Sequence, residues 1–140
     1  MDKARQRALL ILMEVNEDSK YANISLKEHL DRKEFNDRDA SFITQLVYGT
    51  LENQTTIDRV LKKFAKMKRV NPRIENILRM GAYQILYLDK VPDSAACNEA
   101  VKLCIGLGLK PLKGFVNGVL RNISRNKKDL NISKPLAKDA

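Results

Sequence analysis

Residues 71–88 place the strongest constraint on the fold of this chain, because they form a helix that is apolar on most of its sides. Asn71 is a good N-cap and Pro72 suits the first helical position. Beyond its polar first turn, Arg79 and Gln84 are nearly alone as polar groups. Two apolar stripes recur at helical spacing: Ile74, Ile77, Leu78, Ala82, Ile85 and Leu88 form one, and Met80, Tyr83 and Tyr87 form the other. Such a helix is buried on most sides, so we expect it at the centre of the domain.

A glycine stands in the middle of this helix, although glycine there costs roughly 1 kcal/mol relative to alanine. We interpret Gly81, next to Ala82, as the point where a neighbouring helix approaches closely. Glu75 is placed to pair with Arg79 one turn further on. The glycine is therefore predicted to serve packing and not chemistry.

The rest of the chain repeats the helical spacing of apolar residues and contains no convincing period-2 run. We predict an all-α domain, a compact bundle of about seven helices. Besides the central helix, helices are expected at residues 2–16, at 25–33 beginning with Ser25, from Asn36 onward, at 54–65, from Pro92 to Gly106 or Gly108, and from Pro111 to Asn126. The helix that begins at Asn36 is expected to bury Phe42, Leu46, Val47 and Leu51.

The length of 140 residues fits one domain. Residues 1–126 are expected to form its helical body, and residues 127–140 a tail or linker, because NKKDLNISKPLAKDA at 126–140 has little apolar content and one proline. Cys97 and Cys104 share one helical face, which indicates buried thiols in a reducing cytoplasm. No apolar run reaches the ~20 residues of a membrane span, so we expect a soluble cytoplasmic protein.

The sequence offers no convincing active site. His29 has no cysteine or carboxylate partner at ligand spacing, so we expect a surface histidine and not a metal ligand. The glycines of GLGLK at 106–110 follow a helix and are typical of a helix end. Ser94 and Ser124 lack a partner histidine. We therefore predict no catalytic residue, metal or cofactor in this chain.

The net charge of +9, about two thirds of it in residues 71–140, favours a polyanionic partner. Nucleic acid fits better than a membrane, because no segment combines a basic face with exposed large aromatic residues. In the last predicted helix one face carries Lys113, Asn117, Arg121, Arg125 and Lys128, with Gly114 and Gly118 beside it. The opposite side is expected to bury Leu112, Phe115, Val116, Val119 and Ile123. This face is either an RNA surface or an ordinary solvated face.

Two further basic clusters occur. Residues 59–73 contain seven basic groups and no acidic group. Lys3 and Arg7 lie one turn apart in the first helix, where their repulsion suggests an anionic partner. Charge alone gives salt-sensitive binding without sequence preference, whereas specificity would need bases stacked on aromatic side chains such as Tyr21 or Tyr48, or hydrogen bonds from Asn and Gln.

Three long motifs carry a family resemblance: YGTLENQTTIDRVL (48–61), LRMGAYQILYLDKVPDSAACNEAV (78–101) and GFVNGVLRNISR (114–125). Together they resemble the N-terminal domain of ribosomal RNA small subunit methyltransferase B, a cytosine-5 methyltransferase of the Sun/Fmu type. That domain is similar to the transcription antitermination factor NusB, a helical RNA binder. The resemblance spans residues 3–126 and implies a NusB-like antitermination-factor fold.

The resemblance also implies a function. The complete enzyme would use S-adenosylmethionine to methylate a cytosine of 16S ribosomal RNA, through a C-terminal methyltransferase domain that these 140 residues lack. This part would bind small-subunit ribosomal RNA, and the family's basic N-terminal contact carries over to Lys3, Arg5 and Arg7. Two alternatives stay open: a free-standing antitermination factor that binds RNA with a ribosomal protein, and a helical adapter that packs on the catalytic domain.

Overall fold

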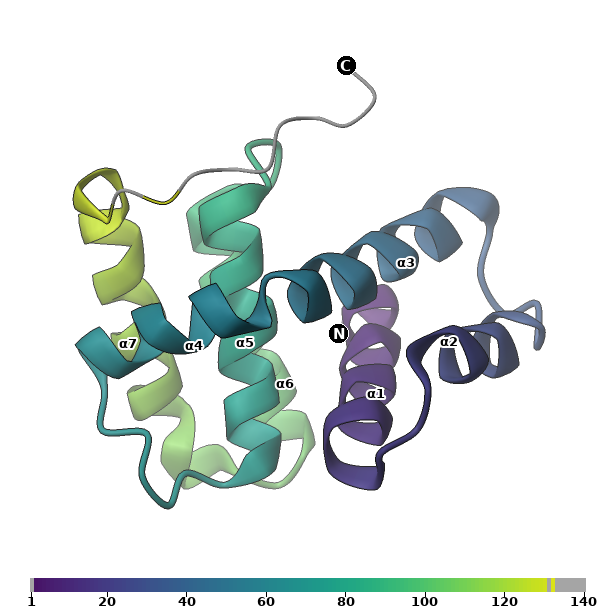
Figure 1. Cartoon of the computed structure of the whole chain (residues 1–140), viewed down its shortest axis with the longest axis horizontal. Helices are drawn as coiled ribbons and strands as arrows, with labels where there is room; N and C mark the ends of the chain where they lie inside the picture. Colours follow the sequence, from purple (N-terminus) through teal and green to yellow (C-terminus); the bar gives the residue numbers. More distant parts are fainter. Residues whose placement is uncertain (1, 131, 133–140) are drawn as a thin grey trace.

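The computed structural model describes residues 2–130 and 132, which fold into seven α-helices and two 3-10 turns (Figure 1). No strand occurs in these residues. The α-helices are α1 (Lys3–Asp18), α2 (Ala22–Leu30), α3 (Asp37–Glu52), α4 (Gln54–Phe64), α5 (Pro72–Tyr87), α6 (Asp93–Gly106) and α7 (Lys113–Asn126). The 3-10 turns are η1 (Lys110–Leu112) and η2 (Lys127–Asp129). The prediction of an all-α bundle is confirmed.

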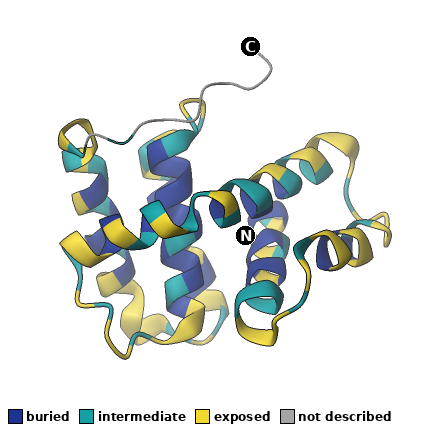
Figure 2. Ribbon diagram, in the orientation of Figure 1, coloured by how far each residue is buried: buried dark blue, intermediate teal, exposed yellow. Residues whose placement is uncertain are grey.

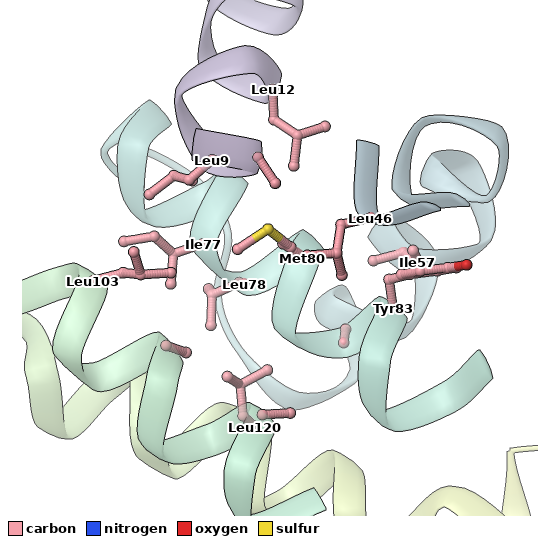
Figure 3. Packing of buried hydrophobic residues seen from close by; sticks show 14 of the residues in the cluster. Leu9, Leu12, Leu46, Ile57, Ile77, Leu78, Met80, Tyr83, Leu103 and Leu120 are labelled. Atoms are coloured by element: carbon pink, nitrogen blue, oxygen red, sulfur yellow. The ribbon is translucent and has the colours of Figure 1, made fainter. Parts of the chain in front are cut away.

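Helix α5 is the centre of the domain, as its apolar circumference predicts. It packs against α1, α3, α4, α6 and α7, and Figure 2 shows it buried along most of its length. Figure 3 shows side chains from all six of these helices meeting in the core. Asn71 caps the first turn of α5 by accepting a hydrogen bond from the backbone N–H of Arg73 at 2.8 Å.

The glycine in α5 does admit a neighbouring helix. A Cβ atom at Gly81 would lie only 2.7 Å from Cδ1 of Leu120, so the bare backbone lets α7 approach. A second glycine of this kind, which the sequence analysis does not single out, is Gly49 in α3. A Cβ atom there would overlap the ring of Tyr83 on α5. Both glycines therefore set how closely α5 meets its neighbours.

Several boundaries differ from the predicted ones. Helix α2 begins three residues before Ser25, and the Ser25 side chain is buried instead of capping a helix. In α3, Ile43 and Thr50 are buried, whereas Phe42 and Leu51 are only half-buried. Pro111 lies in η1 and not in the last α-helix. Two residues of the predicted tail, Leu130 and Ile132, pack against the core, and residues 131 and 133–140 lie outside the described part.

The two cysteines are buried and unpaired, as predicted. Burial raises the pKa of both thiols, and the sulfur of Cys104 donates to the backbone oxygen of Leu109 at 3.0 Å. Thiolate is the nucleophilic form of cysteine, so neither residue is prepared for nucleophilic chemistry. None of the helices in the described part of the chain is long and apolar enough to cross a lipid bilayer.

The prediction of a surface histidine is wrong. His29 is 6% exposed, and its Nε2 atom lies 3.1 Å from Oε2 of Glu14. Ser25 donates to Oε1 of the same carboxylate at 2.6 Å, and Lys20 pairs with it at 3.3 Å. Ser25 and His29 lie four residues apart, so both side chains meet α1 from one face of α2. This carboxylate therefore fastens α2 to α1.

The Glu14 network predicts a loss of stability in acid. Burial pulls the pKa of Glu14 upward, but hydrogen bonds from Ser25, His29 and Lys20, together with the charge of His29, outweigh burial and lower the pKa from 4.5 to about 2. A lowered folded-state pKa stabilises the fold above the unfolded value of 4.5, and this stabilisation disappears as the pH falls towards 2. Because the side chain is 29% exposed, solvent screening reduces the contribution to about 1–2 kcal/mol.

Urea unfolding at a series of pH values tests this expectation. The wild-type protein should exceed Glu14→Gln in unfolding free energy by about 1–2 kcal/mol at pH 6, and the difference should vanish near pH 2. A constant difference across this range would show that the charge of Glu14 does not stabilise the fold.

Candidate nucleic-acid interface

A basic groove lies between α6 and α7. Helical spacing of four residues places Lys113, Asn117 and Arg121 on one side of α7, where they face Asn98 and Lys102 of α6. The groove has a volume of about 530 Å³, and its remaining lining residues are Val101 and Gly114. The buried side of α7 consists of Val116, Val119, Leu120 and Ile123. We call this hollow the α6–α7 groove.

The groove carries uncompensated positive charge. Arg121 donates from Nε to Oδ1 of Asn117 at 3.2 Å and from Nη2 to Oδ1 of Asn98 at 2.9 Å, and both acceptors are neutral amides. Within the described residues, neither Arg121 nor Lys113 has a carboxylate partner. Lys102 pairs only with Glu99, at 3.3 Å and with 57% of the lysine side chain exposed. Exposed ion pairs of this kind contribute little stabilisation, so the groove remains cationic.

The remaining predicted residues of the α7 face, Arg125 and Lys128, do not line the groove. Arg125 is exposed, and its Nη1 atom lies 3.3 Å from Oδ1 of Asn122. Lys128 lies beyond the end of α7, in η2, so the α-helical spacing that assigned it to the same face does not hold. Its neighbour Lys127 pairs with Asp93 at 2.9 Å. Arg125 therefore has no carboxylate partner among the described residues, but it does not line the α6–α7 groove.

The three residues of the predicted N-terminal contact, Lys3, Arg5 and Arg7, differ in exposure and in their partners. Lys3 is exposed and has no partner in the described part of the chain. Arg7 pairs with Glu34 at 2.8 Å and lies over the ring of Phe35.

The third residue of this set is a packing residue in the structure. Arg5 is 9% exposed and donates from Nε to Oε1 of Gln84 at 2.7 Å. Its guanidinium also pairs with Asp2 and lies 5.2 Å from the ring centre of Phe42. A guanidinium with these contacts joins α1 to α5 and α3, so we remove Arg5 from the candidate interface.

The basic side chains of segment 59–73 are exposed to solvent. All seven of its lysine and arginine side chains are exposed, and none has a partner among the described residues: Arg59, Lys62, Lys63, Lys66, Lys68, Arg69 and Arg73. Leu112 and Phe115, predicted to be buried, are 37% and 36% exposed. They join Lys66 and Arg69 around a hollow of about 320 Å³. The prediction fails there because Leu112 lies in η1, outside the α-helical spacing on which the prediction depends, and Phe115 precedes Val116, the first buried residue of α7.

Asn98 and Lys102 are groove residues that the sequence analysis misses. Their spacing of four places them on one face of α6, and this spacing is the only signal present in the sequence. Of the two aromatic residues proposed for base stacking, Tyr21 is 74% exposed and is the N-cap residue of α2, a helix that lies on the other side of the molecule from α7 (Figure 1). Tyr48 is half-buried. No group of His, Cys, Asp and Glu residues suited to a metal ion occurs in the described residues.

Comparison with known sequences gives one family and two kinds of relative. The family model described as the NusB family matches residues 2–125. A Bacillus subtilis protein named "Probable ribosomal RNA small subunit methyltransferase B" is 41% identical over 122 residues, which are 86% of this chain and 27% of that protein. The "Transcription antitermination protein NusB" of Bacillus licheniformis is 36% identical over 123 residues, which are 86% of this chain and 92% of that protein. The chain thus spans about a quarter of the methyltransferase relatives it matches.

Comparison with solved structures gives the same fold. A crystal structure of the antitermination factors NusB and NusE in complex with dsRNA contains a chain that superposes with a TM-score of 0.81. That match covers 89% of this chain and 98% of the other, at 23% sequence identity. A Thermotoga maritima structure, T. maritima NusB, gives a TM-score of 0.80 at 21% identity.

Proposed function

This chain belongs to the NusB family, and from that premise we propose that it is an RNA-binding domain whose α6–α7 groove meets the phosphate backbone of small-subunit ribosomal RNA. The observation that carries the proposal is the groove itself, which three cationic side chains line and no carboxylate residue does. Phosphate contacts of lysine and arginine supply most of the affinity in such complexes. The relatives support the choice of ligand, because a NusB protein has been crystallised with NusE and dsRNA.

The finer proposal is that this domain serves a cytoplasmic, S-adenosylmethionine-dependent ribosomal RNA cytosine-5 methyltransferase. The 41% identity to the Bacillus subtilis methyltransferase B supports it. In this proposal the cofactor and the nucleophilic cysteine belong to a methyltransferase domain of the same protein, and the helical domain holds the RNA. The buried thiols of Cys97 and Cys104, with their raised pKa values, agree with this division of labour.

Binding of small-subunit ribosomal RNA fragments as a function of salt concentration tests the proposal. We expect the logarithm of the association constant to fall linearly with the logarithm of the salt concentration, with a slope of about 0.7 for each phosphate contacted on a single strand. Fluorescence anisotropy of labelled fragments gives both the affinity and the slope. Absence of binding at low salt, or binding that does not depend on salt, would overturn the proposal.

A free-standing antitermination factor is the second candidate. It is favoured by the match to the Bacillus licheniformis NusB protein, of which this chain covers 92%. The two candidates predict different coding sequences in the gene beyond codon 140. A methyltransferase domain encoded in the same frame is expected under the first candidate, and an immediate stop codon would support the second.

A further inference from the structure

We propose that Arg121 is a geometric clamp for one phosphodiester group of the RNA, and that Asn98 and Asn117 are positioning residues that hold its guanidinium in place. This inference rests on the proposed RNA-binding function and adds how one contact is made. In this inference the contact of Arg121 depends on hydrogen-bond geometry, whereas the contacts of the other basic residues depend only on charge.

The hydrogen bonds of Arg121 leave a fixed part of its guanidinium for a ligand. Of its five N–H donors, one on Nε is used by Asn117 and one on Nη2 is used by Asn98. The remaining donors have no partner in the described part of the chain, and a phosphate accepts from a guanidinium in a bidentate manner. Because α6 and α7 each supply one acceptor, the orientation of the group is set before the ligand arrives. Little side-chain freedom is then lost on binding.

The type of residue at the two acceptor positions supports a ligand-binding role. Asparagine orients the guanidinium but leaves its full positive charge, whereas aspartate in the same place would neutralise it. Arg79 differs from Arg121 in this respect. It is 11% exposed and is paired with the carboxylates of Asp58 at 2.8 Å and Glu75 at 3.2 Å. Arg79 is a structural arginine with its charge satisfied. Arg121 is held by two hydrogen bonds to neutral amides, so its charge remains available.

The surroundings of Arg121 suit a nucleotide backbone. Lys113 and Lys102 add charge on either side of the groove, and Val101 adds an apolar surface for a ribose. At Gly114 nothing lies within 4 Å of the position of a Cβ atom, so the RNA strand has open access to the backbone of α7. The volume of about 530 Å³ falls within the range of ligand clefts. By contrast, the seven exposed cations of residues 59–73 have no orienting contact and offer charge alone.

Arg121→Lys is the decisive variant, because it keeps the charge and removes the fork of donors. We expect it to weaken binding of a small-subunit ribosomal RNA fragment about tenfold, with the salt slope unchanged. The matched control is Arg38→Lys, since Arg38 is an exposed arginine of α3 outside the groove. That control should keep the wild-type affinity.

The positioning role of Asn98 has its own test. Asn98→Asp would pair with Arg121 and is expected to weaken binding about tenfold, whereas Asn23→Asp on α2 adds the same charge and should change the affinity less than about threefold. Nuclear magnetic resonance of the Arg121 Nε–H group gives a direct readout. Its signal should shift when the dinucleotide UpU is added and stay in place with uridine, which has no phosphate.

The outcomes separate the inference from the proposed function. Loss of affinity in Arg121→Lys but not in Arg38→Lys, together with the UpU-dependent shift, supports the clamp. Wild-type affinity in Arg121→Lys overturns the clamp and leaves the RNA-binding function intact. Failure of the wild-type protein to bind the RNA overturns both.

Discussion

The triple variant Lys113→Glu, Arg121→Glu and Arg125→Glu is expected to bind small-subunit ribosomal RNA fragments at least about a hundredfold more weakly than the wild-type protein, a loss of roughly 2.8 kcal/mol. If Lys113 and Arg121 in the α6–α7 groove and Arg125 further along α7 each contact a phosphate, as the proposed function implies, each substitution removes one contact and places a negative charge opposite the RNA backbone. Losing three contacts should also reduce the salt slope by about 2 on a single strand. Anisotropy titrations at several salt concentrations measure both quantities.

A control of equal charge makes this result interpretable. Lys27, Arg32 and Arg38 are exposed on the α2–α3 side of the molecule, and changing all three to glutamate alters the net charge by the same amount. We expect this control to lose no more than a few-fold in affinity, because the distant charges are screened by salt. If the α7 variant keeps its helical circular dichroism and also keeps its RNA affinity, the α7 face is not the RNA surface, as the adapter hypothesis predicts.

The Gly49→Ala variant is expected to lose about 3 kcal/mol of unfolding free energy, although alanine is the better helix former. The added methyl group would overlap the ring of Tyr83, which is 6% exposed and stacked on Tyr87 with ring centres 5.6 Å apart. Tyr83 has little room to move, so overpacking should outweigh the gain of about 1 kcal/mol in helix propensity. Urea unfolding measures the difference.

Two other glycines provide a graded comparison. Gly81→Ala brings a methyl group 2.7 Å from the flexible end of Leu120, so we expect a smaller loss of about 1 kcal/mol. Gly118→Ala on α7 meets nothing within 4 Å and should stabilise the protein by up to about 1 kcal/mol. If Gly49→Ala were as stable as Gly118→Ala, the close approach of Tyr83 to α3 would not exist in solution.

The spacing of apolar residues predicts those features of the fold that depend on the sequence of a single helix. The apolar circumference of residues 72–87 identifies α5 as the central helix, and Gly81 within it indicates the approach of a neighbour. The N-caps Asn36 and Asn71 are visible in the sequence because their hydrogen bonds stay within three residues, and both form at 2.8 Å. These features depend on local chemistry, which a single sequence displays.

Two of the predictions that fail depend on a partner far along the chain. His29 lies in a charged stretch and is nevertheless buried, because Glu14 reaches it from α1. Arg5 belongs to a basic N-terminus but bonds to Gln84, seventy-nine residues away. Asn98, for which the sequence analysis makes no prediction, accepts a hydrogen bond from Arg121 only because α7 packs beside α6. Spacing along one helix cannot identify the opposite helix, so the candidate groove is only half visible in the sequence.

The arrangement of helices around α5 has a consequence for how this domain would serve two ligands at once. Helices α1, α2 and α3 pack together on one side, α6 and α7 pack together on the other, and α5 contacts members of both groups (Figure 1). Because a close-packed interior has low compressibility and transmits strain, a displacement of α5 caused by a molecule bound on one side would reach the other side. Molecules bound on opposite sides would contribute additive free energies only if neither of them displaces α5.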